Sequence, residues 1–242
     1  WHVKYTNFCG DDNALDPPRL EWHFVEVCTS HNCGIEADAA NPCWMSNGSL
    51  YTNYERVVET TANAPAKEVK FDPMTRYFTF VWAGDYDCSP WLKARAQAMW
   101  TDKNLGEVPY MFSVNINLID RVPMCFDIMY ENRTENDYIL AAEGMGYVTP
   151  SALFQGFVGK EDDPITRTLP SGDKEYLAYA KPYYDFLKLD VSSRIINGFT
   201  VMEADAMEVY NQTSPRGNFV QNSTAGEHDL RIYDGTPYMR MF

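Results

Sequence analysis

The stretch from Lys67 to Trp82 reads KEVKFDPMTRYFTFVW and carries the strongest local signal in the 242-residue chain. Apolar and polar residues alternate on both sides of Asp72-Pro73, and a period of two is typical of a strand that buries one face. Asp-Pro favours a turn between the two runs. The sequence therefore predicts a β-hairpin with strands over residues 67–72 and 76–82.

The same alternation recurs elsewhere, in a chain in which aromatic residues make up 14% of the total. Aromatic side chains favour strands and bury a large area each. Two sets would each share one face of a strand: Phe112, Val114, Ile116 and Leu118, and Met124, Phe126, Ile128 and Tyr130. Further candidate strands cover residues 54–60, 138–148, 153–159, 176–180, 185–191, 198–204 and 229–234. The pattern predicts a mainly β, antiparallel fold.

One segment, at about residues 89–101, predicts a short helix instead. Ser89 can cap its start, Pro90 suits the first helical position, and the run WLKARAQAMW is rich in helix formers. An apolar stripe of this helix would face a sheet: Leu92, Ala96, Met99 and Trp100.

Cysteine content and hydrophobic periodicity both change after residue 45. Residues 1–45 hold four of the six cysteines and show little periodicity, which predicts an irregular N-terminal extension tied by disulfides. Residues 46–242 are predicted to form a single antiparallel β domain, because a chain of this length can bury one sizeable core.

Sequons and cysteines indicate the compartment. Glycans on asparagine and stable disulfides are both formed in the oxidising secretory lumen. The sequons are Asn47, Asn132, Asn211 and Asn222, and the cysteines are Cys9, Cys28, Cys33, Cys43, Cys88 and Cys125. Disulfides are favoured over zinc, because no second ligand pair completes a tetrahedral set around His31. With Trp1 first, the chain is predicted to be a processed glycoprotein, secreted or in the lysosomal lumen.

The net charge of -14 disfavours nucleic acid or an anionic membrane surface as partner, because both require a basic patch. No run of 18 apolar residues is present, so no membrane span is predicted. Acidic clusters at residues 11–16 and 161–163 favour solvated loops, with loosely held calcium as the alternative. No metal ligands are singled out.

No catalytic signature is complete in the sequence. The four histidines form no metal-binding pair, and no Gly-x-Ser-x-Gly elbow is present. A carboxylate pair for glycoside hydrolysis stays open, because the fold rather than the spacing places such a pair among the 34 acidic residues. Without a signature, binding is favoured over catalysis.

The stretch from Arg56 to Cys125 resembles the ependymin-related family. The similar parts are Arg56-Val57-Val58, the hairpin from Val69 to Phe78, Cys88 before an amphipathic segment, Met111-Phe112-Ser113-Val114-Asn115, and Cys125. Cys43 would be the family's first cysteine. The resemblance departs after Cys125, because family members have further cysteines in the C-terminal half. If it holds, Cys9, Cys28 and Cys33 would replace those lost partners.

The resemblance implies a curved antiparallel pair of sheets, or half-open barrel, similar to bacterial lipoprotein carriers. It also implies a dimer, homo- or heteromeric, whose apolar pocket binds a lipid or a carotenoid, with calcium in some members. Burial of an elongated apolar ligand in such a pocket is favourable at roughly 25 cal/mol per Å². Candidate wall residues are Phe78, Phe80, Trp82, Trp91, Met99, Phe112, Val114, Ile116, Phe126 and Ile128. Ordinary core packing is the alternative role for each of them.

The leading hypothesis is therefore a secreted, non-enzymatic glycoprotein that carries or stores a hydrophobic small molecule, with no obligatory cofactor. The first alternative is a secreted hydrolase that uses two acidic residues. The second alternative is a calcium-dependent adhesion or matrix module.

Overall fold

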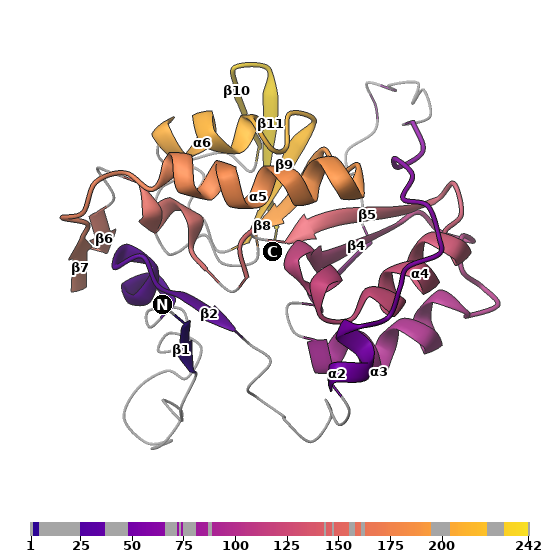
Figure 1. Cartoon of the computed structure of the whole chain (residues 1–242). Helices are drawn as coiled ribbons and strands as arrows, with labels where there is room; N and C mark the ends of the chain where they lie inside the picture. The colour runs from indigo at the N-terminus through magenta and orange to yellow at the C-terminus, as the bar shows by residue number, and fades with distance from the viewer. Residues whose placement is uncertain are drawn as a thin grey trace, which may run out of the picture.

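The computed structural model describes residues 2–4, 25–36, 48–65, 72, 74, 81–86, 89–142, 144–146, 148–154, 158–160, 163–194, 204–221 and 230–241. A seven-stranded sheet forms its centre (Figure 1). The strands are β3 (Trp82–Tyr86), β4 (Tyr110–Asn115), β5 (Asp137–Ala142), β8 (Val191–Arg194), β9 (Gly217–Gln221), β10 (Leu230–Tyr233) and β11 (Thr236–Met241). Their order is β10-β11-β9-β8-β5-β4-β3, and every neighbouring pair is parallel except β10 with β11.

Helices connect the parallel strands, as parallel pairing requires. They are α2 (Gly48–Thr52), α3 (Ser89–Trp100), α4 (Pro123–Asn132), α5 (Asp173–Leu187) and α6 (Ala204–Asn211), with the short 3₁₀ turns η3 (Ile116–Asp120) and η4 (Pro150–Leu153). Residues 25–30 are also helical. Two small strand pairs lie beside the main sheet: β1 (His2–Lys4) with β2 (Gly34–Glu36), and β6 (Val158–Lys160) with β7 (Asp163–Thr166).

The predicted mainly β, antiparallel two-sheet fold is therefore wrong, and the chain is an α/β protein. The error comes from short apolar runs that satisfy more than one period. Residues 123–132 alternate, yet they form α4, which begins at Pro123 and buries Phe126, Met129 and Tyr130 at helical spacing. The alternation also predicts strands at residues 176–180 and 185–191, whereas α5 covers the whole of the first and the start of the second. Its buried positions are Tyr176, Ala180, Tyr184 and Leu187.

Other local predictions have mixed outcomes. The helix predicted at 89–101 is confirmed as α3. The stretch 229–234 contains β10, and 138–148 contains most of β5 followed by a loop. Residues 54–60 are irregular. The 67–82 hairpin lies mostly outside the described residues, but Trp82 begins β3, which pairs in parallel with β4.

The main core lies between the sheet and the helices. Phe112 and Val114 of β4, with Ile139 and Ala141 of β5, project to the same side as buried residues of α3 to α6. Neighbouring helices also contact one another: the Tyr176 and Tyr210 rings of α5 and α6 lie 6.3 Å apart. The Tyr130 hydroxyl of α4 donates to the Leu187 carbonyl of α5 at 2.7 Å. Burial raises the pKa of Tyr130 to about 12, which keeps this donor protonated.

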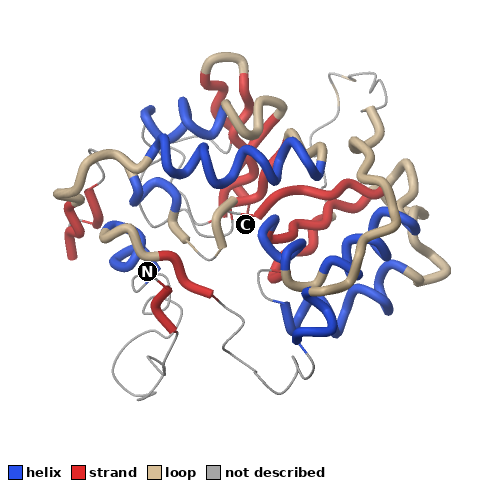
Figure 2. The backbone as a smooth tube through the Cα atoms, in the orientation of Figure 1, coloured by secondary structure: helices blue, strands red, loops and turns tan. Residues whose placement is uncertain are grey.

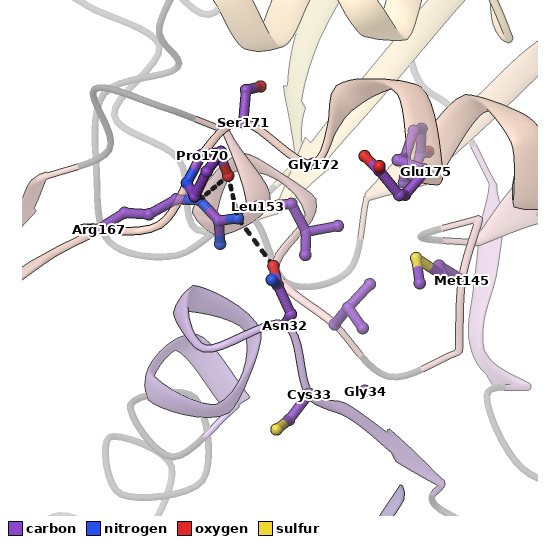
Figure 3. Close-up of a pocket in the computed structure, with 12 residues that line it drawn as sticks. Asn32, Cys33, Gly34, Met145, Leu153, Arg167, Pro170, Ser171, Gly172 and Glu175 are labelled. Atoms are coloured by element: carbon purple, nitrogen blue, oxygen red, sulfur yellow. Dashed lines mark hydrogen bonds between the residues drawn. The ribbon is translucent and has the colours of Figure 1, made fainter. Parts of the chain in front are cut away.

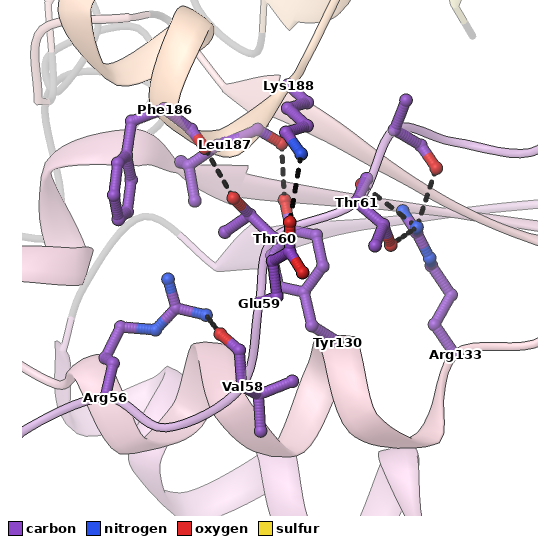
Figure 4. Close-up of polar contacts among 11 residues, drawn as sticks. Arg56, Val58, Glu59, Thr60, Thr61, Tyr130, Arg133, Phe186, Leu187 and Lys188 are labelled. Atoms are coloured by element: carbon purple, nitrogen blue, oxygen red, sulfur yellow. Dashed lines mark hydrogen bonds and ion pairs between the residues drawn. The ribbon is translucent and has the colours of Figure 1, made fainter.

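An irregular segment, residues 54–65, crosses the helices and is called the strap (tan in Figure 2). Its first half is bound by the Asp127 carboxylate of α4, which accepts from Arg56 Nε at 2.7 Å and from the Val57 N–H at 2.8 Å. Farther along, the Thr60 hydroxyl donates to the Phe186 carbonyl at 2.7 Å. Lys188 and Glu59 form an ion pair beside it (Figure 4).

The second half of the strap reaches the sheet. Arg133 donates from Nη2 to the carbonyls of Thr61 and Ala62, and from Nη1 to the side chain of Asn63 (Figure 4 shows the Arg133 end). Asn63 in turn donates to the Ile139 carbonyl at 2.8 Å and accepts from the Ile139 N–H at 2.9 Å. Because β8 pairs with β5 only at Ala141 and Ala142, Asn63 satisfies backbone groups of β5 that β8 leaves unpaired.

The division of the chain after residue 45 stays a prediction. Residues of the predicted extension do contact the remainder: the Thr149 N–H donates to Thr29 Oγ1 at 3.2 Å, and Arg167 donates to the Ser30 carbonyl at 3.1 Å. Within the described segments, no helix has the length and apolarity needed to cross a membrane.

Candidate functional site at the carboxyl edge of the sheet

Eight of the ten predicted wall residues belong to the described part of the chain. Phe112, Val114, Ile116 and Phe126 are buried in the core, and Met99 and Ile128 pack partly buried against it. Trp91 is 40% exposed on α3, Trp82 is partly buried on β3, and Phe78 and Phe80 lie outside the described residues. None of the eight described ones lines the two pockets described below. Their role as ligand contacts stays a prediction, beside the alternative of core packing.

Cys28, Cys33 and Cys125 are free thiols in the structure, and the disulfides predicted from the sequence stay a prediction. Cys9, Cys43 and Cys88 lie outside the described residues, as do the sequons Asn47 and Asn222. The other two sequon side chains are hydrogen-bonded within the fold: Asn132 donates to the Ile128 carbonyl and Asn211 to the Tyr233 carbonyl. Among described residues, no group of three acidic, histidine or cysteine side chains could hold a metal ion.

The residues of greatest chemical interest follow β5, an interior strand of the sheet. Residues 144–150 read Gly-Met-Gly-Tyr-Val-Thr-Pro and are called the glycine loop; Tyr147 is outside the described residues, as is Glu143 just before the loop. Open parallel sheets bind ligands at the carboxyl ends of their strands, and the glycine loop begins at this edge. Asn115, the last residue of neighbouring β4, accepts from the Gly146 N–H at 3.3 Å.

Gly144 allows the close approach of the loop to α5. Its φ is +95°, and a Cβ built there would lie 2.6 Å from the hydroxyl oxygen of Tyr176, which is fully buried. Only glycine meets both conditions without strain. The position of the loop is therefore fixed by the first turn of α5.

We expect Gly144→Ala to lower the free energy of unfolding by about 2–3 kcal/mol, because left-handed backbone strain and the clash with Tyr176 add. Gly235→Ala is the matched control: Gly235 has φ +80°, but nothing lies within 4 Å of its Cβ position. Urea denaturation of both variants separates the two costs. An equal loss in both would contradict the close approach.

A pocket of about 440 Å³ lies beside the glycine loop and is called the loop pocket (Figure 3). It is formed by residues 32–34, by the loop, by η4, and by the segment that leads into α5. Its lining is Asn32, Cys33, Gly34, Met145, Val148, Leu153, Arg167, Pro170, Ser171, Gly172, Glu175 and Tyr176. This volume is typical of a site for a small molecule.

Arg167 fastens the wall of the loop pocket. Its guanidinium donates to the carbonyls of Ser30, Ala152 and Pro170 and to Asn32 Oδ1, with distances from 2.6 to 3.2 Å (Figure 3). All these acceptors are uncharged, and burial lowers the pKa of Arg167. Arg167 thus joins the N-terminal residues 30–32 to the start of α5.

Glu175 is the only carboxylate among the described residues that line the loop pocket. It lies exposed in the first turn of α5, and Figure 3 shows its carboxylate on the side of the helix that faces Leu153. The positive end of the helix macrodipole favours a negative charge there. Glu175 is therefore available to a ligand for acid–base chemistry.

The face of the sheet opposite the helices carries further polar groups. Trp82, Ser113 and Ser193 share this face by the strand register, and each has a buried polar atom, Nε1 or Oγ, without a hydrogen-bond partner among the described residues. Thr149 Oγ1 in the glycine loop is in the same situation. Buried polar atoms nearly always have a hydrogen-bond partner, so these four unpaired atoms indicate positions where water or a ligand could bind.

The fold is that of an α/β protein, and the candidate site lies at the carboxyl edge of its mostly parallel sheet. Residues 75–237, more than half of the chain, match the family model described as "GxGYxYP putative glycoside hydrolase C-terminal domain". The chain belongs to this family. The pattern in the family's name matches the glycine loop at every fixed position except Thr149, which stands where the pattern has tyrosine.

A solved structure described as "a putative hydrolase from Bacteroides thetaiotaomicron" is similar to the chain, with a TM-score of 0.66 and 19% sequence identity. The similarity covers 90% of this chain and 40% of that one, so the chain spans less than half the length of its structural neighbour. At this identity the likeness shows the fold. No curated protein matches the chain.

The family corrects the functional predictions made from the sequence. The resemblance to the ependymin-related family is wrong, and with it the hydrophobic-ligand carrier, lipid or carotenoid, and the expectation that the protein is not an enzyme. The first alternative, a hydrolase with an acidic pair, is better supported. The glycine loop is the signal that sequence reading missed, because residues 138–148 were assigned to one strand.

Proposed function

We propose that the chain supplies the loop-pocket part of a glycoside hydrolase active site. The observation that carries the proposal is the glycine loop: the pattern that names the family lies at the carboxyl edge of the sheet and directly lines a pocket. The loop pocket has a volume of about 440 Å³, which is within the range of small-molecule sites and accommodates about one or two sugar rings.

Glycoside hydrolysis needs two carboxyl groups, one to protonate the leaving oxygen and one to act as nucleophile or to activate water. Glu175 is the residue we propose for the second role, because it is the carboxylate that lines the loop pocket among the described residues. The acid must be a second carboxyl group. Glu143, which stands between the end of β5 and Gly144 in the sequence, is our candidate from sequence position alone.

Three further predictions from the sequence are kept as separate proposals. The protein is secreted, it needs no obligatory cofactor, with bound calcium as the alternative, and it forms a dimer. Extracellular polysaccharide is a substrate that suits a secreted protein. These expectations do not bear on the carboxylate roles, and each has its own measurement.

The test is hydrolysis by the full chain of a panel of neutral and acidic oligosaccharides, followed as the release of new reducing ends. We expect activity on at least one member, and its reduction to background in the double variant Glu143→Gln/Glu175→Gln. Glu208→Gln, an exposed glutamate on α6, serves as control and keeps full activity. A panel without any hydrolysis, or a double variant as active as the control, would overturn the proposal.

A further inference from the structure

A second pocket lies over the helices, away from the glycine loop. It has a volume of about 590 Å³ and is called the aromatic groove. The strap contributes Tyr54 and Arg56, η3 contributes Asp120, and α5 contributes Pro182, Tyr183 and Phe186. On α5 the groove lies two turns beyond the residues that line the loop pocket, Glu175 and Tyr176.

The aromatic groove exposes large ring surfaces to solvent. Phe186 is 55% exposed and Tyr54 is 39% exposed. Tyr179, which is 36% exposed, lies at the rim with its ring centroid 5.4 Å from that of Tyr183. Aromatic side chains that remain accessible in a hollow, instead of completing the core, mark a contact surface for another molecule.

Polar groups of opposite charge stand among these rings. The Tyr183 hydroxyl donates to Asp120 Oδ2 at 2.5 Å, which leaves the other carboxylate oxygen on an exposed residue. Arg56 uses Nε for Asp127 and Nη2 for the Val58 carbonyl, while its Nη1 has no acceptor among the described residues. Pro182 lacks an N–H, so the carbonyl of Ala178 loses its helical partner on this side of α5.

The side chains that line the aromatic groove indicate the chemical class of its ligand. Asp127 already neutralises Arg56, so the Asp120 carboxylate is the remaining charge among the described lining residues, and it disfavours an anionic ligand. Donors and acceptors lie between the rings, so an acyl chain would leave them unsatisfied. A sugar has both apolar C–H faces and a rim of hydroxyl groups, which matches ring surfaces set among hydrogen-bonding groups.

We propose that the aromatic groove is a non-catalytic binding site for a neutral oligosaccharide. The argument uses the groove's own chemistry and does not require Glu175 or the glycine loop. It goes beyond the proposed hydrolase function, because it assigns a separate site that would hold a long substrate while the loop pocket acts on it.

The experiment is calorimetric titration of the full chain, carrying Glu143→Gln/Glu175→Gln so that probes stay intact, with neutral hexasaccharides of glucose, xylose and N-acetylglucosamine. We expect at least one probe to bind, and Phe186→Ala to weaken its binding at least fivefold. Phe186 is mostly exposed and its backbone carbonyl still accepts from Thr60, so the variant folds. Trp91→Ala removes an aromatic of similar exposure on α3, outside the groove, and leaves affinity unchanged.

Two results would overturn the inference: binding of none of the three probes at millimolar concentration, or binding that Phe186→Ala leaves unchanged. Failure of the hydrolase proposal is a distinct result. In that case wild-type protein releases no reducing ends, yet Phe186→Ala still weakens binding. Hydrolysis together with unchanged binding in Phe186→Ala removes the groove alone.

Discussion

Glu175→Gln is expected to lower kcat on the hydrolysed oligosaccharide by about 10²- to 10⁴-fold, the usual contribution of a positioned acid–base group. The substitution keeps the size of the side chain and removes its charge. Because Glu175 lies exposed in the first turn of α5 and forms no ion pair with another described residue, the loss should appear in kcat with little change in the melting temperature. Steady-state kinetics and thermal unfolding of the same sample check both parts.

A comparison of two variants distinguishes catalysis from binding at Glu175. If the carboxylate acts as nucleophile or base, Glu175→Gln lowers kcat, whereas the loss of a binding contact alone raises KM. Glu175→Asp keeps the charge but withdraws the carboxylate by one methylene, so it should retain more activity than the glutamine variant. A glutamine variant with wild-type kcat and a raised KM would reduce Glu175 to a binding residue.

Asp127→Ala is expected to lower the free energy of unfolding by about 3 kcal/mol, because it leaves the nearly buried guanidinium of Arg56 without its counter-ion. The side chains of Arg56 and Asp127 are 13% and 6% exposed, and their ion pair measures 2.7 Å. The same carboxylate binds the Val57 N–H and the Tyr54 hydroxyl. Its loss should release the first half of the strap, which hydrogen exchange at Val57 would detect.

The matched control is Asp185→Ala, which breaks an ion pair of similar length on the surface of α5. Lys181 and Asp185 lie 3.0 Å apart, but their side chains are 53% and 65% exposed. Exposed pairs of this kind contribute below about 0.5 kcal/mol. Urea denaturation should therefore separate the two variants clearly, and similar midpoints would show that the strap adds little to stability.

The sequence predicted individual elements better than the architecture. Ser89 and Pro90 signal the start of α3 with residue types whose role does not depend on tertiary context. By contrast, Met124 to Tyr130 alternates and also fits helical spacing, and only packing against the sheet decides between the two. Once that run and α5 were read as strands, the crossover helices disappeared and a parallel sheet could not be deduced.

The candidate site was largely beyond sequence reasoning. Gly144 and Gly146 are visible in the sequence, but the need for glycine at 144 comes from Tyr176, 32 positions later, whose hydroxyl oxygen occupies the space of a Cβ. Likewise, residues 30–32 meet Arg167 only in the folded chain. The open alternative of a carboxylate pair was sound, because its positions follow from the fold rather than from spacing.

The threonine at position 149, where the family pattern has tyrosine, suggests how the pocket beside the glycine loop differs among members of the family. It is fully buried, and its N–H donates to Thr29 Oγ1 in the helical residues 25–30, so Thr29 lies against position 149 in this chain. A phenol ring, which the family pattern has here, is larger than the threonine side chain and would need more space beside Thr29. Members with tyrosine are therefore expected to place the corresponding segment farther from the glycine loop. The same loop would then open onto a pocket of different outline, and substrate preference could diverge within the family without any change in the carboxylates.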